Sequence, residues 1–514
     1  MNRQETLTSR IESSRIVQFA LRFTSEKGHL LAAIVLVFSC TLMLLSDWPK
    51  WWPPLPQPVM AVVKPLTQSY VNGRHFIFDR YQREVPRSVQ TQPVTIVAID
   101  EKSLAQLGQW PWPRHKLANL IDSIGKHEPA AIGLDIYMPE VDQTSPDQVA
   151  VALASSHPDL ARQMRALPSN DELLSQSLQR TPSVLGAAGF DFKTYTTSEG
   201  LRTWPMKLQG AQSLPSSARD YPAVLASLPL LQSAAAGQAL LSVDSEQGAI
   251  RRMPLVSAVG GQPVPSLAIE MFRVALGEPS AQIQIDPHGI HAVTVGDVQV
   301  PTQANGDVFV HYAPQAQTIQ RYVSALDVIN QQVDPQALAG KLVLIGLTGM
   351  GLNDMRTTVL GDHVPGIEIQ AQLIESIFDQ RFLLRPWWMV FAEVGCALWV
   401  GGLMIWLVPR LSPSKGLGAI YRLPKIGMVA SVGINALALS AGFYLFREHG
   451  LLFDAASFFL VTSAVFGMIF AFVKASAAKA KKALEKKEWD ELLQRAQQAE
   501  AALQVHSKTI EGRT

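Results

Sequence analysis

The chain has 514 residues, a length that predicts more than one structural unit. It carries 44 Lys and Arg residues against 43 Asp and Glu, and this balance gives no argument for a nucleic-acid partner. The only cysteines, Cys40 and Cys396, both lie in long apolar runs. This excludes a disulfide framework and a CxxC metal site from the soluble part of the chain, which must be stable through its core alone.

The first apolar run follows a basic N-terminal segment, residues 1–28, which we expect to be cytoplasmic. The run at residues 29–48 is short, but it reaches the lower limit of about 17 residues for a membrane-spanning helix. A cleaved signal peptide is the alternative interpretation. No cleavage site of small residues follows, however, and Trp48, Trp51 and Trp52 suit the headgroup region of a membrane. The sequence therefore favours an uncleaved anchor.

Two short β-rich segments, residues 94–100 and 131–140, flank an amphipathic stretch at residues 116–126. The apolar side chains of that stretch recur at helical spacing. Strand, helix and strand at this length predict a βαβ unit in a mostly parallel sheet, and hence an α/β fold for the soluble domain. Asp100 and Asp135 follow the two strands, which we expect to be adjacent. Ligands collect at the carboxyl ends of the strands in such sheets.

Later segments extend this α/β domain. Residues 183–190 and 340–346 are continuous apolar runs of the kind that forms buried strands. A helix is predicted from Pro265, because proline suits the first turn of a helix. Residues 283–310 alternate between apolar and polar side chains and contain several glycines, which is typical of hairpins.

From residue 387 the chain becomes strongly apolar. Residues 387–408, 426–446 and 451–473 are each long enough to span a membrane, so we expect four spans in all. The loop at residues 409–425 carries basic residues and no acidic one. By the positive-inside rule, the N-terminus, this loop and the C-terminal tail lie in the cytoplasm, and the domain before residue 385 lies outside.

Several motifs occur together in the soluble part of the chain: Val97-Ala-Ile-Asp-Glu-Lys-Ser-Leu104, Gly108-x-Trp-Pro-Trp-Pro-Arg114, Gly133-x-Asp135, Arg251-Arg-Met-Pro-Leu255, Pro265-Ser-Leu-Ala268, Gly340-Lys-Leu-Val-Leu-Ile-Gly346, Asp354 and Pro365-Gly-Ile-Glu368. Together they resemble the type-two CHASE domain, the cyclase/histidine-kinase-associated sensory extracellular module of bacteria. The resemblance covers residues 60–385.

This resemblance implies a periplasmic sensory domain, followed by three membrane helices and a cytoplasmic output such as a kinase or nucleotide cyclase. The chain departs from that pattern at its end, because only residues 474–514 follow the last span. The closing Ile510-Glu-Gly-Arg513 resembles a protease-cleavage linker. We therefore expect the output beyond Thr514 or in a partner protein.

Four polar residues are candidates for a ligand site at the strand ends: Asp100, Arg114, Asp135 and Asp354. Carboxylates can bind a cation or a basic ligand, and an arginine can hold an anion. The alternative is a structural ion-pair network that caps strands and helices. Asp100 in particular can cap the helix that begins near Ser103, which is a purely local role.

No catalytic or metal-binding pattern stands out. The histidines of the predicted outer domain are scattered and form no HExxH or comparable set, and no G-x-S-x-G nucleophile motif occurs. We therefore expect no enzymatic activity in this chain, no cofactor and no metal.

Glu393 lies within the second predicted span. A carboxylate in a membrane helix is a functional candidate by default. Because its depth is shallow, two environments are open: the outer headgroups, or Asn435 of a neighbouring helix.

The tail, residues 474–514, has strong helix formers and one apolar face formed by Leu484, Leu492, Ala496, Ala499 and Leu503. A dimeric coiled coil that leads to an output domain fits this pattern. A membrane-proximal helix whose lysines meet anionic lipid is the alternative.

These features predict a bacterial receptor that crosses the inner membrane several times. Its outer domain senses an extracytoplasmic ligand of unknown identity, and a homodimeric helix bundle passes the signal to a cytoplasmic output. The alternative is a membrane scaffold whose outer domain binds another protein. A large exposed apolar patch on that domain would support this alternative.

Overall fold

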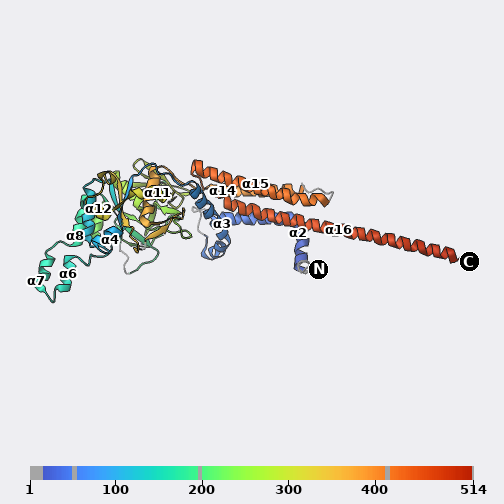
Figure 1. Cartoon of the computed structure of the whole chain (residues 1–514), viewed down its shortest axis with the longest axis horizontal. Coiled ribbons are helices and arrows are strands. Elements are labelled where there is room, and N and C mark those ends of the chain that lie inside the picture. Colours follow the sequence, from blue (N-terminus) through green and yellow to red (C-terminus); the bar gives the residue numbers. More distant parts are fainter. Residues whose placement is uncertain (1–14, 49–54, 195–199, 353, 411–416, 512–514) are drawn as a thin grey trace.

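The computed structural model describes residues 15–48, 55–194, 200–352, 354–410 and 417–511. Half of the predicted cytoplasmic segment, Trp51 and Trp52, part of the basic loop and the last three residues lie outside the described residues. The molecule is elongated, with a mixed α/β domain at one end and a helical bundle at the other (Figure 1). One helix, α16 (Ala455–Glu511), extends well past the end of the bundle.

The domain is built on a seven-stranded sheet with the order β15-β1-β16-β2-β3-β6, in which β7 also pairs with β3. Its strands are β1 (Val94–Ile99), β2 (Ala131–Leu134), β3 (Ser183–Phe190), β6 (Ala223–Leu225), β7 (Gly237–Leu240), β15 (Tyr322–Ser324) and β16 (Leu342–Leu347). Within this sheet β6 pairs antiparallel with β3, and the other neighbours pair in parallel.

Strands β1 and β2 are buried along their whole length, and β16 is buried up to Gly346, because both faces of the sheet are covered by helices. Successive side chains therefore enter two separate cores, as Ile96 and Val97 do. One core packs against α5, α8, α9 and α12, and the other against α10 and α13. The result is a three-layer α/β arrangement.

The helices of the domain are short. They are α4 (Glu101–Leu107), α5 (Arg114–Gly125), α6 (Pro146–Leu153), α7 (Pro158–Arg165), α8 (Asn170–Arg180), α9 (Pro229–Ala234), α10 (Leu267–Ala275), α11 (Gln315–Thr318), α12 (Ala325–Ile329) and α13 (Gly366–Phe378). Helices α6 and α7 form a hairpin that projects from the end of the domain remote from the bundle (Figure 1).

Smaller sheets complete the domain. A four-stranded sheet has the order β13-β12-β11-β4, a three-stranded sheet the order β10-β9-β5, and two pairs are β14-β8 and β17-β18. Their strands are β4 (Met206–Gln209), β5 (Asp220–Tyr221), β8 (Arg252–Pro254), β9 (Val256–Val259), β10 (Gln262–Pro265), β11 (Ala281–Asp286), β12 (Gly289–Val295), β13 (Val298–Pro301), β14 (Asp307–Phe309), β17 (Met355–Thr357) and β18 (His363–Pro365). The hairpins predicted in residues 283–310 correspond to β11, β12 and β13.

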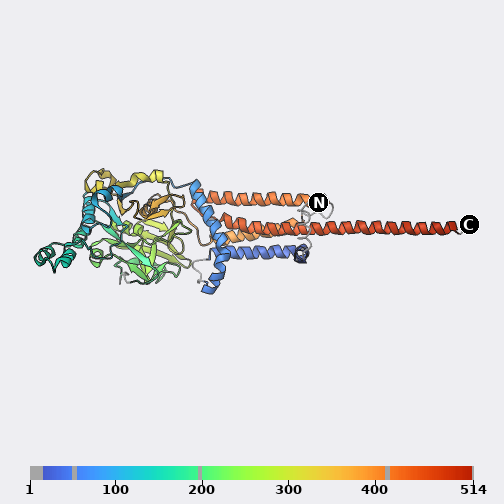
Figure 2. The same cartoon turned by 60° about the horizontal axis from the view of Figure 1, so that its bottom comes forward.

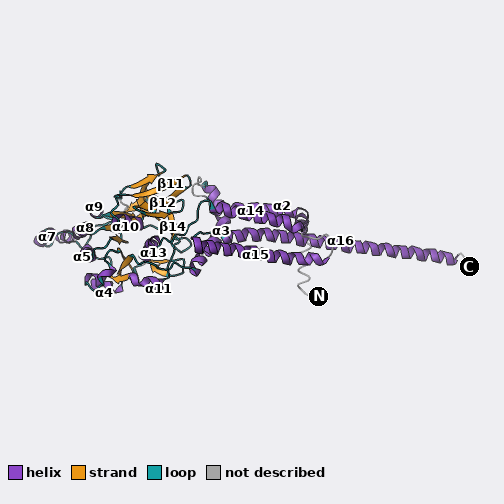
Figure 3. Ribbon diagram, turned by 90° about the horizontal axis from the view of Figure 1, so that it is seen from above, coloured by secondary structure: helices purple, strands orange, loops and turns teal. Residues whose placement is uncertain are grey.

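The bundle contains four helices that are long and apolar enough to cross a membrane: Gly28–Ser46, Met389–Leu407, Met428–His449 and Ala455–Ala475. They belong to α2 (Arg15–Ser46), α14 (Met389–Arg410), α15 (Leu417–His449) and α16. Figure 3 shows them running side by side away from the domain. The expectation of an α/β domain with four candidate spans agrees with this structure.

Helix α3 (Gln57–Glu84) occupies most of the stretch between the first span and the domain. It continues through Pro65 and crosses the ends of the bundle helices on the side of the domain (Figure 2). The N-terminal half exposes apolar side chains such as Val62 and Leu66, whereas Arg74, Phe78 and Asp79 are buried. Helix α3 is therefore the layer that joins the domain to the bundle.

One expectation about the sheet is wrong. Strands β1 and β2 were expected to be neighbours, but β16 lies between them and pairs in parallel with both. The sequence prediction joined the two strands because they are consecutive in a βαβ unit. The strand that separates them comes from much later in the chain, and nothing local to residues 94–140 reveals it.

Candidate functional site

Asp100 follows β1 and caps α4. Its Oδ1 accepts hydrogen bonds from Ser103 N at 2.9 Å and from Ser103 Oγ at 2.6 Å. Ser324 Oγ, at the end of β15, donates to the same oxygen at 2.9 Å. This confirms the predicted capping role, which satisfies an otherwise unpaired amide of the first helical turn. Asp100 thus ties α4 to the edge strand of the sheet.

Arg114 lies in a different environment, at the first residue of α5. Its backbone N donates to Asp142 Oδ2 at 2.7 Å, and its Nε lies 3.8 Å from Asp171 Oδ1. Asn170 Nδ2 also donates to Asp142 Oδ2, at 2.8 Å. These contacts join the start of α5 to the start of α8. Arg114 therefore belongs to a helix-capping cluster at the base of the α6–α7 hairpin.

Asp135 and Asp354 lie close enough to influence each other. Burial raises the pKa of Asp135 to about 7, the negative charge of Asp354 adds to that effect, and Arg356 opposes it. Burial likewise raises the pKa of Asp354, whose Oδ1 lies 3.4 Å from Arg356 Nη2. The backbone of Asp354 also accepts a bond from Gly366 N, where a side chain would collide with the carboxylate. Of the four strand-end candidates, these two form a pair.

The four strand-end candidates thus occupy three environments, and the idea of one shared pocket is wrong for Asp100 and Arg114. Each of those two carries out a capping or ion-pairing task with its own partners. The Asp135–Asp354 pair remains the candidate for titration or for binding a cation at the strand ends. Among the described residues, no group of three or more His, Cys, Asp or Glu side chains is arranged to hold a metal ion.

Glu393 is fully buried near the start of α14. Its two carboxylate oxygens accept hydrogen bonds from Arg385 Nη1 and Nη2, each at 2.7 Å. Oε1 also accepts from the backbone N of Asp454 at 2.7 Å. Asn435 is not the partner of Glu393, because its amide oxygen accepts from Thr462 Oγ1 instead, and the Glu393 side chain is buried against Arg385.

Arg385 and Glu393 belong to a larger set that we call the juxtamembrane ion cluster: Asp47, Arg74, Arg385, Glu393 and Asp454. Arg385 Nε donates to Asp47 Oδ2 at 2.7 Å, and Arg74 Nε donates to Asp454 Oδ2 at 2.7 Å. Arg74 Nη1 lies 3.4 Å from Asp47 Oδ1. Two guanidinium groups therefore bridge three carboxylates, and this arrangement satisfies charges that would be costly to bury alone.

Each member of the cluster comes from a different part of the chain. Asp47 directly follows α2, Arg74 lies in α3, Glu393 lies in α14, and Asp454 caps α16 by accepting from Ser457 N at 2.9 Å. Arg385 lies in the segment by which the chain leaves the domain. The cluster thus joins the exit of the domain to the ends of three spans.

Helix α3 is bound to the domain by a second ion pair. Asp79 accepts two hydrogen bonds from Arg251, at 2.9 Å from Nε and 2.7 Å from Nη2. Arg83 Nε donates to the backbone oxygen of Val359 at 2.8 Å. Helix α3 therefore contacts the domain through its C-terminal end, and it contacts the bundle through Arg74 near its middle.

A further buried network ties the segment after α3 to α13. Arg87 donates to Asp379 Oδ2 at 2.5 Å and lies 3.1 Å from Glu375 Oε2, which also accepts from Arg321 at 2.7 Å. Burial raises the pKa of Glu375, against the opposing effect of the two arginines. Because α13 packs against the central sheet, this network anchors the connecting segment to the core.

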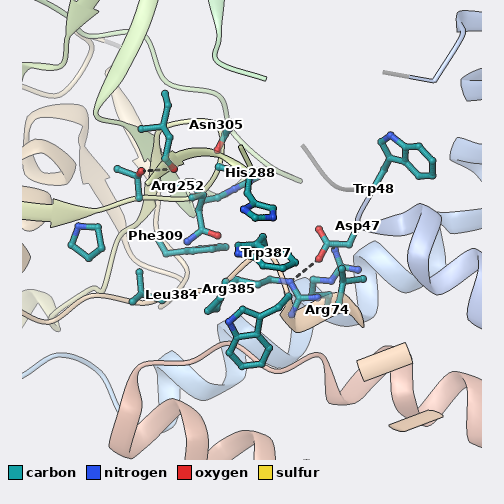
Figure 4. Close-up of a pocket in the computed structure, with 18 of the residues that line it drawn as sticks. Asp47, Trp48, Arg74, Arg252, His288, Asn305, Phe309, Leu384, Arg385 and Trp387 are labelled. Carbon is teal, nitrogen blue, oxygen red and sulfur yellow. Dashed lines mark hydrogen bonds and ion pairs between the residues drawn. The ribbon is translucent and has the colours of Figure 1, made fainter. Parts of the chain in front are cut away.

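Beside the cluster lies a cavity of about 500 Å³, which we call the juxtamembrane cavity. Its walls come from the end of α2, from α3, from the β11–β13 sheet and from the segment before α14. Figure 4 shows Arg385 and Asp47 on one side of it, with Trp387 and His288 between them and Arg252. The rings of His288 and Trp387 stack with centroids 3.9 Å apart.

The profile of the CHASE2 domain matches residues 59–408, which is more than half of the chain. The chain belongs to the CHASE2 domain family. This confirms the resemblance drawn from the motifs at residues 97–104, 108–114 and 133–135. CHASE2 is a sensory domain, and with four apolar helices it fits a membrane sensor. No curated protein and no solved structure matched the chain.

Proposed function

We propose that this CHASE2 protein is a transmembrane receptor that passes a signal from its outer domain through the juxtamembrane ion cluster to the bundle. The observation that carries the proposal is the position of Arg385. Arg385 lies in the segment that connects the domain to α14. Its side chain donates hydrogen bonds to Glu393 near the start of α14, to Asp47 after α2, and to the backbone oxygen of Leu452 just before α16. A movement of the domain relative to the membrane would therefore act on three spans at once.

Helix α3 supplies a second route for the same movement. Its Asp79 is held by Arg251 of the domain, and its Arg74 is held by Asp454 at the start of α16. These two residues lie five positions apart in the same helix, which is about one and a half turns. A shift of the domain that displaces Arg251 would therefore be transmitted to Asp454, the cap of α16.

The proposed placement follows the charge pattern of the loops. The sequence before the first span and the loop at 409–425 carry the basic residues that favour the cytoplasm. We place the CHASE2 domain in the periplasm of a bacterial inner-membrane protein, and the end of α16 in the cytoplasm. Helix α16 continues without a break from its span to Glu511, which suits a rod that delivers motion to an output beyond Thr514 or in a partner.

The receptor is proposed to act as a homodimer through α16. Leu492 and Leu493 of this helix are exposed in the single chain, and Trp489 is 66% exposed. A coiled coil would bury this surface. Because the chain carries no recognised output motif, we expect purified residues 1–514 to turn over neither ATP nor GTP, and reproducible kinase or cyclase activity would contradict an input-only role.

The coupling is tested by hydrogen exchange on the full chain in lipid nanodiscs. Asp79→Asn breaks the pair with Arg251 and should change exchange rates in α16 beyond residue 475. Arg385→Gln breaks the other route, so the double variant should change exchange in α16 more than either single variant does. Asp191→Asn, which breaks an exposed pair with Arg219, is the matched control. Identical exchange in α16 for all variants would contradict the proposal.

A second candidate function, a scaffold that binds another protein, is favoured by the α6–α7 hairpin. This hairpin buries little besides Ala150 and Ala161 and exposes Val151, Leu160 and Leu167. Exposed apolar side chains on a projecting element suit a protein contact. A photo-crosslinker placed at Val151 should then give one discrete adduct in cells, whereas one placed at Arg219 should not.

A further inference from the structure

The juxtamembrane cavity has features that the signalling proposal does not use. It lies where the spans meet the domain, and its volume of about 500 Å³ falls within the range of small-molecule sites. Its walls combine charged, aromatic and backbone groups from segments that are far apart in the chain. A cavity built in this way can hold a ligand, and its level relative to the membrane indicates the chemical class of that ligand.

Three tryptophans indicate the level of the cavity relative to the membrane. Trp48 lies two residues after the end of α2, and Trp387 and Trp388 directly precede α14. All three line the cavity. Tryptophan is enriched at the level of the lipid headgroups, where its ring meets the apolar region and its N–H meets water. The cavity is therefore at the level where the headgroups of the adjacent leaflet lie, whichever side of the membrane the domain occupies.

The charges that line the cavity have both signs. Three guanidinium groups and three carboxylates contribute to its walls: Arg74, Arg252, Arg385, Asp47, Glu246 and Asp286. Burial lowers the pKa of His75, which also lines the cavity, to about 4, and nearby Arg251 adds to this effect. His75 is therefore neutral near pH 7 and leaves the two signs balanced. A purely anionic or purely cationic ligand would meet repulsion from half of these groups.

A zwitterion suits this wall. A phosphate accepts hydrogen bonds from guanidinium N–H groups, and an ammonium group is attracted to carboxylates and to the faces of tryptophan rings. Arg252, whose side chain is 27% exposed, lies over the ring of Phe309, pairs with Glu246 and lies 3.9 Å from Asp307. Because a guanidinium has five N–H donors, it can bind a phosphate beside this pair. Asp286, which lies 3.7 Å from His288, and the stacked rings of His288 and Trp387 add an acidic and aromatic surface to the cavity.

We propose that the juxtamembrane cavity binds the phosphoethanolamine headgroup of a phospholipid from the leaflet that adjoins the CHASE2 domain. The phosphate lies toward Arg252, and the ammonium group lies toward Asp286 and the tryptophans. The acyl chains leave the cavity beside Val390, at the start of α14, and enter the membrane. This site stands independently of whether the protein transmits a signal.

The test uses the purified full chain in detergent, titrated with lipids and observed by native mass spectrometry. Phosphatidylethanolamine, phosphatidylcholine and phosphatidylglycerol with the same acyl chains are compared. We expect one molecule of phosphatidylethanolamine to be retained about fivefold more strongly than phosphatidylglycerol, the difference that about 1 kcal/mol produces. Equal retention of all three lipids would overturn the proposal, and so would a preference for phosphatidylglycerol.

Two variants localise the binding. Arg252→Gln removes a charge that faces the phosphate, and Trp388→Leu removes an aromatic wall; each should weaken retention of phosphatidylethanolamine roughly fivefold. The matched controls are Arg219→Gln, at a partly exposed arginine outside the cavity, and Trp399→Leu, at an exposed tryptophan within a span. Both controls should bind as the unchanged protein does. Equal retention in all four variants would show that the lipid binds elsewhere.

Competition with soluble phosphoethanolamine and with inorganic phosphate tests whether the cavity binds a lipid or a free solute. We expect phosphoethanolamine to compete with the lipid only at a large excess, because it lacks the acyl chains that enter the membrane, and inorganic phosphate not to compete. Competition at equal concentration by either solute would overturn the lipid assignment. Thermal melts of the four variants confirm that each is folded, and a Trp388→Leu protein that fails to fold leaves Arg252→Gln to decide.

Discussion

Arg385 and Glu393 are joined by two parallel hydrogen bonds of 2.7 Å, and the pair lies at the boundary between the CHASE2 domain and the α14 span. Both side chains are almost completely shielded from solvent. A bidentate guanidinium–carboxylate pair fixes the direction of both groups, which a single hydrogen bond would not do. The exit of the domain and the first turns of α14 must therefore move together.

Changing Glu393 to Gln should destabilise the protein strongly. Arg385 would keep a buried charge with one of its two carboxylate partners removed, and breaking a buried pair from one side costs about 3–5 kcal/mol. Thermal unfolding of the full chain in detergent measures this loss. The Arg385→Gln variant should lose a similar amount, because it leaves Glu393 unpaired.

The double variant Arg385→Met with Glu393→Met serves as the control. Replacing both charges by apolar side chains of similar size removes the unpaired charge, so this variant should be more stable than either single Gln variant. The exposed pair of Arg219 and Asp191 gives the reference for a surface contact, whose loss should cost at most about 1 kcal/mol. Single variants no worse than that reference would show that the Arg385–Glu393 pair carries little energy.

A different outcome is expected at Asp100, which caps α4. Asp100→Ala removes the oxygen that accepts from Ser103 N and should cost about 0.5–2 kcal/mol. Asp100→Asn keeps an acceptor oxygen in the same place and should cost clearly less. Chemical denaturation of the two variants checks this order. Equal losses would mean that the negative charge, rather than the cap, is what stabilises this corner of the domain.

Elements with an unambiguous local pattern were predictable. Residues 183–190 form β3 as expected, and the helix expected at 116–126 is α5, because one is a continuous apolar run and the other repeats at helical spacing. The order of the strands was not predictable in the same way. The insertion of β16 between β1 and β2 depends on pairing between distant segments, for which the local sequence carries no signal.

The same distinction applies to the candidate sites. The cap at Asp100 was predictable because its partner Ser103 is three residues away. Arg74 and Asp454 are 380 residues apart in the sequence, so their bond could not be inferred from spacing. Glu393 was recognised as a candidate because a carboxylate in an apolar run is unusual, yet its partner was missed. Arg385 lies outside the run, and no local pattern marks it as the partner of Glu393.

The arrangement of the chain across the membrane gives a third prediction. Reporter fusions after Gly200, in the CHASE2 domain, should be active in the periplasm, and fusions at Gln504 of α16 should be active in the cytoplasm. A further fusion at Ser414, in the basic loop between α14 and α15, should also report the cytoplasm. A cytoplasmic signal from the Gly200 fusion would contradict both the proposed placement and the proposed direction of signalling.

Asp135 should make the stability of the protein depend on pH. Its pKa is raised to about 7 in the folded protein, chiefly by burial and further by Asp354, whereas the ordinary value is 3.8. Between these two values the folded state holds a proton that the unfolded chain has lost. The stability associated with this group is therefore fully present below about pH 4 and is lost as the pH rises toward 7.

The variant Asp135→Asn cannot ionise, so it should escape this loss. Its melting temperature relative to the unchanged protein should rise between pH 4.5 and pH 8, by an amount that corresponds to roughly 3 kcal/mol. The substitution can also change the melting temperature by an amount that does not depend on pH. This amount does not affect the test, because only the change of the difference between the two proteins with pH is compared. Asp191→Asn, on the exposed surface, should show no such change. A difference for Asp135→Asn that stays the same at every pH would mean that Asp354, rather than Asp135, holds the shared proton, since two close carboxylates titrate as one system.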